Sequence, residues 1–144
     1  MAGYRFIWNP SFAIAMVSMI DGYTDVTVVV SDAQKAKKWY VDKLGFKVVL
    51  DKGHAICVSP NVKGSSLVLH LCGDNFAPLE PGNTGIGFTA DDFDKTCEEL
   101  SGKGVKFSVK PKKEEGYKMA KFLDLDGNEF WLFESSAAKK VMEE

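Results

Sequence analysis

The sequence predicts an α+β fold of two tandem β-α-β-β-β modules, whose strands form a curved mixed sheet around a cleft with the helices on its outer face. The first observation is an internal repeat, since residues 26–47 and 86–106 each contain a short strand, an acidic helix start, an amphipathic helix and a glycine stop. Asp32 of the first copy corresponds to Asp92 of the second, sixty positions later. The second observation is that the strands alternate apolar and mixed side chains, which is typical of a sheet with two different faces.

Both helices carry start and stop signals. Asp32 and Asp92 can accept hydrogen bonds from the free amides of a first helical turn and interact well with its positive end. Gly45 and Gly104 can adopt the left-handed conformation that ends a helix. The apolar residues between these signals recur at helical spacing, at Ala36, Tyr40 and Leu44 in the first copy and at Phe93, Cys97 and Leu100 in the second.

Turn residues divide the remaining sequence into short strands. Glycines and Asx residues at Gly53, 61–64, Gly116 and 126–128 supply the turns. The strands expected after the first helix are 46–50, 55–59 and 67–72, and those expected after the second are 106–110, 118–124 and 129–133. Each copy therefore continues its strand and helix with three further strands.

The domain boundaries follow from these elements. A linker at 75–83, with two prolines and a glycine, separates a first module at about 22–74 from a second at about 84–136. The two modules together form a single domain, 22–136. An apolar arm, residues 1–21, precedes it and is expected to pack on the domain or on a partner subunit. A charged tail, residues 137–144, follows it.

Period-two alternation predicts which way the strand side chains point. In the strand at 67–72 the leucines form one row, and Val68, His70 and Cys72 form the other. We expect the apolar rows to lie under the helices. The opposite rows are too polar to seat a helix and too aromatic and aliphatic for plain solvent, so they predict a small-molecule cleft. A homodimer interface across the same face is the alternative, and the two can coexist.

The composition is that of an ordinary globular chain, with 144 residues, 45% of them hydrophobic and 26% charged. The net charge of −2 argues against a nucleic-acid partner, which normally brings a basic excess. Three cysteines without a C-x-x-C pair indicate neither a zinc knuckle nor a disulfide framework, and they favour a reducing, cytoplasmic setting. The apolar stretch at 11–20 is too short to span a bilayer, so no membrane partner is expected.

Three stretches carry a family resemblance: VTVVVSDAQKAKKWYVDKLGF in the first copy, GIGFTADDFD in the second, and FLDLDGNEFWLFE at the end. With them, residues 22–136 resemble the vicinal oxygen chelate superfamily, which includes glyoxalase I, bleomycin-resistance proteins and extradiol dioxygenases. The resemblance implies the fold more strongly than the reaction, because one scaffold carries many functions.

The metalloenzymes of that superfamily place one ligand at the start of the first strand of each module and one in the last strand of each. In this sequence those positions hold Asp25, His70, Gly85 and Trp131. Glycine has no side-chain donor and indole offers only an N–H, so the resemblance implies a protein without the usual metal, and no cofactor is expected. His70 is the best catalytic candidate. The alternative is a divalent-metal-dependent lyase, isomerase or dioxygenase that uses Asp25, His70 and Glu129.

A cleft without a metal suits a planar or cationic organic ligand, as in the drug-sequestering members of the superfamily. Aromatic side chains near carboxylates favour such a ligand by about 0.5–2 kcal/mol per contact. The expected ligand contacts are Asp25, Thr27, His70, Cys72, Gly85, Gly87, Tyr117, Glu129, Trp131 and Phe133. Core filling is the alternative role for Trp131. The sequence thus predicts a small-molecule-binding homodimer and leaves open whether it is an enzyme.

Two further segments bear on the cleft. The mixed-charge run at 110–118 predicts a flexible loop that can border it, with Tyr117 as a contact. Cys72 and His70 share a strand face, but residues two apart on a strand are roughly 6.5–7 Å apart, which is too far to activate a thiol.

Overall fold

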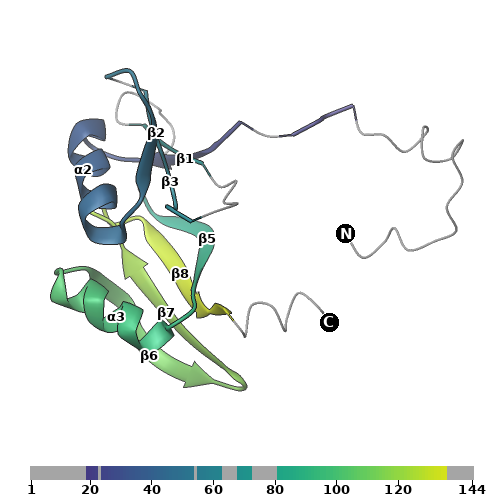
Figure 1. Cartoon of the computed structure of the whole chain (residues 1–144), viewed down its shortest axis with the longest axis vertical. Coiled ribbons are helices and arrows are strands. Elements are labelled where there is room, and N and C mark those ends of the chain that lie inside the picture. The colour runs from purple at the N-terminus through teal and green to yellow at the C-terminus, as the bar shows by residue number, and fades with distance from the viewer. Residues whose placement is uncertain (1–18, 23, 54, 63–67, 73–80, 136–144) are drawn as a thin grey trace, which may run out of the picture.

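The computed structural model describes residues 19–22, 24–53, 55–62, 68–72 and 81–135, and Figure 1 shows their arrangement. The first module contains β1 (Val26–Val29), α2 (Ala33–Leu44), β2 (Lys47–Asp51), β3 (Ile56–Ser59) and β4 (Leu69–Cys72). The second contains β5 (Asn83–Ala90), α3 (Phe93–Gly102), β6 (Lys106–Glu114), β7 (Tyr117–Leu123) and β8 (Glu129–Glu134). The predicted tail and all but the last residues of the predicted arm lie outside the described residues.

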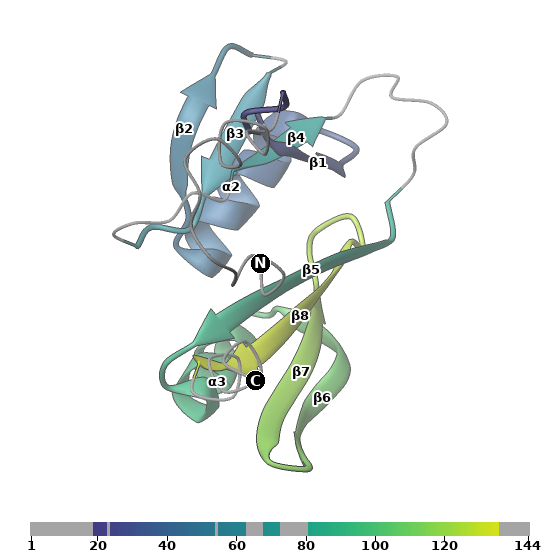
Figure 2. The same cartoon turned by 90° about the vertical axis from the view of Figure 1, so that its right-hand side faces the viewer.

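The strands form two four-stranded sheets with the same internal order, β1-β4-β3-β2 and β5-β8-β7-β6. In each sheet the first strand of the module runs parallel to the last, and the other pairs are antiparallel. Figures 1 and 2 show α2 and α3 on one side of the sheets, and no helix of the described residues lies on the other side. His70 and Trp131, which alternate with buried strand residues, face that other side. We call this side the bare face. The arrangement confirms the predicted fold class, an open curved sheet with its helices outside.

Both helices begin at the predicted aspartates. The Asp32 carboxylate accepts from the backbone N–H of Lys35 at 3.0 Å, and Asp92 does the same for Lys95 at 3.1 Å. Gly45 ends α2 with φ +71°, as predicted. In the part of the chain that the structure describes, no helix is long and apolar enough to cross a membrane.

Side-chain directions follow the predicted alternation. Leu69 and Leu71 are fully buried, while His70 between them is half-buried on the bare face. Phe130 and Leu132 are likewise buried in the second module, with Trp131 half-buried on the other side. The predicted first residue of the fourth strand, at position 67, lies outside the described residues.

The predicted flexible loop at 110–118 is wrong. β6 continues to Glu114 and β7 begins at Tyr117, so most of the segment is a two-stranded hairpin. Only Glu115 and Gly116 form the turn, with Gly116 at φ +80°. Strands can carry these mixed charges because the charged side chains of the hairpin are exposed to solvent. Pairing between the two strands orders the segment, and the local composition does not reveal that pairing.

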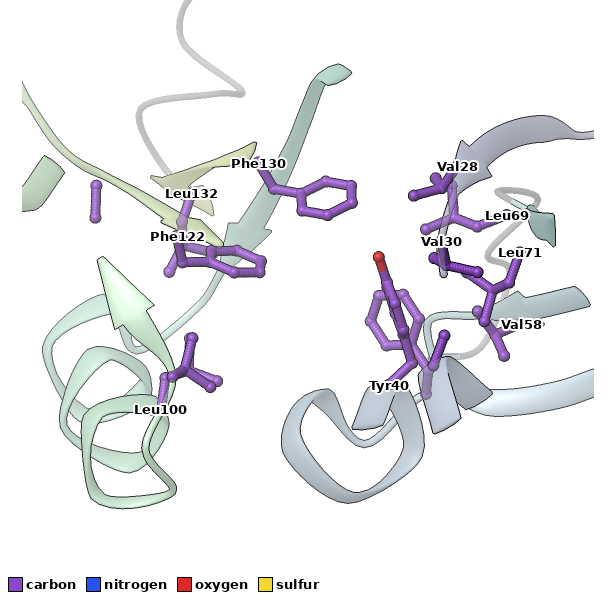
Figure 3. Close-up of a cluster of buried hydrophobic side chains, with 14 of the residues drawn as sticks. Val28, Val30, Tyr40, Val58, Leu69, Leu71, Leu100, Phe122, Phe130 and Leu132 are labelled. Atoms are coloured by element: carbon purple, nitrogen blue, oxygen red, sulfur yellow. The ribbon is translucent and has the colours of Figure 1, made fainter. Parts of the chain in front are cut away.

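The apolar sides of the two modules meet in one continuous core. Tyr40 of α2 points across the junction toward Phe130, as Figure 3 shows, with ring centroids 6.3 Å apart. Phe46 meets Phe88 in the same way, at 5.6 Å. Both contacts are edge-on, a geometry that aromatic pairs favour. The modules therefore pack on each other through α2 and the second sheet.

A buried polar network crosses the same junction. The Tyr40 hydroxyl donates to Asp124 Oδ2 at 2.6 Å, and Asn128 Nδ2 donates to that oxygen and to the Val29 carbonyl, both at 2.8 Å. The backbone N–H groups of Asp126 and Asn128 donate to Asp124 Oδ1 at 2.9 and 2.8 Å. The Asp124 carboxylate is buried, and these donors replace the water it has lost.

We expect Tyr40→Phe to lower the free energy of unfolding by about 1–3 kcal/mol near pH 7, because the buried Asp124 carboxylate loses a donor. Burial first, and then the Asp124 charge, raise the pKa of Tyr40 above its ordinary value of 10.0. The unfolded chain therefore releases this proton before the folded protein does. The stabilisation is complete below about pH 10 and is lost as the pH rises further.

Denaturant unfolding near pH 7 and near pH 10.5 checks both statements, since the difference between wild type and Tyr40→Phe should shrink at the higher pH. Tyr117→Phe is the matched control, because Tyr117 is only half-buried and lies on the bare face. If both variants lost the same stability at both pH values, the bond to Asp124 would not be the cause.

Candidate functional site

On the bare face of the first module, three predicted or neighbouring side chains come into register. His70 of β4 lies opposite Thr27 of β1 and opposite Cys57 of β3. Directly opposed residues of antiparallel strands have Cβ atoms about 4.5–5.5 Å apart, so His70 and Cys57 are close neighbours. Cys72, also predicted, is buried two residues further along β4, opposite Val29.

Cys57 was not predicted as part of this site. The sequence relates His70 to Cys72 along one strand, whereas its neighbour Cys57 follows only from the register of β3 and β4. Burial, and then the Asp25 carboxylate, raise the pKa of the Cys57 thiol. The thiol therefore stays protonated near neutral pH, which disfavours a nucleophilic role. Asp25 directly precedes β1 and is half-buried.

Asp25, His70 and Glu129 do not fit a metal ion in this structure. Asp25 and His70 belong to the first module, whereas Glu129 begins β8 in the second. Glu129 Oε2 accepts from Ser108 Oγ at 2.6 Å, and Oε1 lies 3.6 Å from Lys121 Nζ. Within the described ranges, no three side chains of His, Cys, Asp or Glu are grouped so that they could hold a metal ion.

The bare face of the second module carries an aromatic cluster of Trp131, Phe133 and Tyr117. The rings of Trp131 and Phe133 lie nearly parallel, at 9°, with centroids 5.5 Å apart. The ring centroid of Tyr117, on β7, lies 6.1 Å from that of Phe133. All three side chains are half-buried, so part of their apolar surface faces outward. The structure thus brings together three of the predicted ligand contacts.

The two predicted glycines have different physical roles. Gly87 lies opposite Trp131 in register, and a Cβ atom there would lie 3.3 Å from Phe133 Cε2. The absence of a side chain at Gly87 lets the Phe133 ring lie over β5. Gly85 has φ +69°, a conformation that other residues rarely adopt, and lies where the β5–β8 register shifts.

A lysine that the sequence did not single out completes this half of the site. Lys121 of β7 lies opposite Trp131, with its Nζ 3.9 Å from the centre of the indole ring. The same ammonium is 3.6 Å from Glu129 Oε1, and the lysine side chain is only 20% exposed. A positive charge thus lies between an aromatic face and a carboxylate. No local pattern predicts this contact, because it joins two strands.

The seam between the two sheets contains a pocket. β1 and β5 are the facing edge strands, and a cavity of about 190 Å³ lies between them. Of the predicted contacts it includes Thr27, and Thr84 and Asn128 add polar groups. The volume is smaller than the roughly 300–1,000 Å³ of drug-sized pockets. A hollow of about 940 Å³ lies on the helix side, between α3 and β6, away from the predicted site.

Known proteins share this architecture. A solved structure from Sphaerobacter thermophilus DSM 20745, a member of the glyoxalase/bleomycin resistance protein/dioxygenase superfamily, is 31% identical with a TM-score of 0.72 and covers 82% of this chain and 100% of its own. TnmS3, an antibiotic binding protein from Streptomyces sp. CB03234, is 32% identical with a TM-score of 0.69 and covers 82% of this chain and 98% of its own.

The sequence comparisons agree with the structural ones. The uncharacterized protein YetH of Bacillus subtilis (strain 168) is 31% identical over 121 residues, which are 81% of this chain and 100% of YetH. The model of one protein family matches residues 22–132, from just before β1 to Leu132 within β8. The chain therefore belongs to the Glyoxalase/Bleomycin resistance protein/Dioxygenase superfamily.

Proposed function

We propose that this protein binds a planar organic small molecule on the bare face of its sheets, without a metal ion, and either sequesters it or presents it to another protein. The observation that carries the proposal is the parallel Trp131–Phe133 pair, which lies half-exposed on a sheet face that neither α2 nor α3 covers. The similarity of this chain to TnmS3, an antibiotic binding protein, also supports a small-molecule-binding function.

The two halves of the bare face supply different contacts for such a ligand. The aromatic cluster offers apolar surface for a flat ring, at about 0.5–1.5 kcal/mol per aromatic contact beyond burial. Thr27 and His70 of the first module offer a hydroxyl and an imidazole, which can donate to or accept from polar substituents. In this proposal His70 is a ligand contact rather than a general base.

The enzymatic alternative has less support. A divalent-metal-dependent lyase, isomerase or dioxygenase needs several donors that converge on one ion. Glu129, the third donor of that set, is engaged by Ser108 and Lys121. The geometry therefore favours binding over metal-assisted chemistry at this site.

We also propose that the protein is a cytoplasmic homodimer. The edge strand β2 supports association of two copies, because Val48, Val49 and Leu50 are 41%, 46% and 38% exposed. Antiparallel pairing of two β2 strands around Val49 places Lys47 of one copy opposite Asp51 of the other. Unpaired strand edges with apolar side chains favour such contacts.

Binding is tested with a panel of flat tricyclic aromatic compounds in a thermal-shift assay. A ligand at about 100 times its Kd stabilises the folded protein by about 2.7 kcal/mol. We expect Trp131→Ala to weaken binding by about 2- to 10-fold, because one stacking contact is lost. Trp39→Phe is the matched control, since Trp39 packs against Tyr40 of α2 rather than on the bare face. A panel in which nothing binds would overturn the proposal.

Metal content separates the two functions. We expect protein purified without chelator to contain well under one equivalent of any transition metal, measured by elemental mass spectrometry. A stoichiometric metal that disappears in His70→Ala would instead establish the enzymatic alternative.

Sedimentation velocity tests the dimer. We expect twice the chain mass of 15.9 kDa for the wild type. Val49→Lys should give the monomer with unchanged thermal stability, because the substituted side chain is exposed and like charges would face each other across the pair. A dimer that persists in Val49→Lys would show that β2 is not the interface.

A further inference from the structure

We propose that Lys121 makes this site select anionic aromatic ligands, which are planar molecules with an ionised oxygen group, such as a carboxylate, beside the ring. The inference rests on the proposed function and names the charge of the ligand that the aromatic cluster takes. In this inference an anionic ligand takes the place of the cationic ligand that the carboxylates of Asp25 and Glu129 alone would favour.

The Trp131 indole is in contact with two neighbours on the bare face, Phe133 and Lys121. Phe133, two residues later on β8, lies parallel to one face. Glu129, two residues earlier, lies 3.6 Å from the Lys121 ammonium, which is 3.9 Å from the ring centre. Because Glu129 and Phe133 flank Trp131 on opposite sides along the strand, the ammonium lies on the Glu129 side of the ring and Phe133 lies on the other. A ligand that stacks on Trp131 must therefore move Lys121.

Lys121 is the group that can move at small cost. Its 3.6 Å approach to Glu129 is longer than a hydrogen bond, so no directed bond to that carboxylate holds the ammonium over the ring. Glu129 does not depend on the lysine, because its other oxygen keeps the 2.6 Å bond from Ser108. Ser108 lies on β6, beyond β7, so this bond draws the carboxylate across β7 toward the sheet edge.

The displaced ammonium then sets the ligand charge. It stays tethered to β7 directly opposite Trp131, next to any ring stacked there. A ligand carboxylate can accept a charge-assisted hydrogen bond from it, which is about twice as strong as a neutral one. A cationic ligand would meet a like charge at the same place. The lysine therefore acts both as a cover for the indole and as the partner of an acidic substituent.

The test uses two probes of the same shape, anthracene-9-carboxylate and 9-(aminomethyl)anthracene, titrated against the full chain with tryptophan fluorescence as the readout. We expect the wild type to bind the carboxylate about tenfold more tightly than the amine. Lys121→Met should abolish most of this preference by weakening carboxylate binding about tenfold, whereas Lys121→Arg should retain it because the charge remains.

Lys118→Met is the matched control. Lys118 lies on the same strand but pairs with Asp94 of α3 at 2.8 Å, on the helix side of the sheet, so its loss changes the net charge equally without touching the cluster. An unchanged preference in this variant supports the local role of Lys121. An equal loss in Lys118→Met and Lys121→Met would overturn it, since net charge alone would then explain the selectivity.

The outcomes separate this inference from the proposed function. Tighter binding of the amine, with a further gain in Lys121→Met, would mean that a cationic ligand replaces the lysine on the indole, so the selectivity is overturned and the binding function stands. If neither probe binds in the wild type or any variant, the binding function and the selectivity both fall.

Discussion

The hydrogen bond from the Tyr40 hydroxyl to Asp124 is the interaction on which the arrangement of the two modules depends. It joins α2 of the first module to the turn between β7 and β8 of the second, at 2.6 Å and within the shared core. Asn128 connects this network to β1, because its side-chain amide donates to the Val29 carbonyl. A carboxylate buried at a junction is tolerated only where such donors surround it, so the packing of the modules is specific rather than merely apolar.

The relative placement of the two halves of the bare face depends on this junction. Figure 2 views the sheets from the side opposite α2 and α3. The alternation of buried and half-buried strand residues turns His70 and Trp131 toward that side. The same Asn128 that holds Val29 also lines the seam pocket, so the network and the pocket share a wall. A change in the junction would therefore alter the spacing of the two halves of the bare face as well as the stability of the fold.

Gly85 and Trp131, two of the positions that the resemblance compared with metal ligands, have other physical roles in this structure. Gly85 takes a backbone conformation that accompanies the register shift of β5, and Trp131 is held between Phe133 and Lys121. A metal donor in place of Gly85 would be strained by the positive φ, and one in place of Trp131 would remove the ring that Phe133 and Lys121 contact. On the bare face, the second module thus presents an aromatic cluster, whereas the first module presents the polar side chain of His70.

Local regularities of the sequence determined most of the fold. The repeat, the Asp32 and Asp92 caps, the Gly45 stop and the placement of His70 and Trp131 on one face all follow from dihedral preferences and from the alternation of side chains within single strands. The prediction failed at 110–118, where a charged run is ordered by pairing with its own hairpin partner rather than by composition.

Which side chains contact each other depends on the packing of the strands and modules. Cys57 beside His70, Lys121 over Trp131 and the Tyr40–Asp124 bond each join side chains from different elements. The distances between these side chains depend on strand register and on how the modules pack. The local periodicity of the sequence predicts neither of them. The sequence by itself determined the two modules and the face of each strand, whereas the charge and the aromatic geometry of the site arise from contacts that exist only once the sheets have formed.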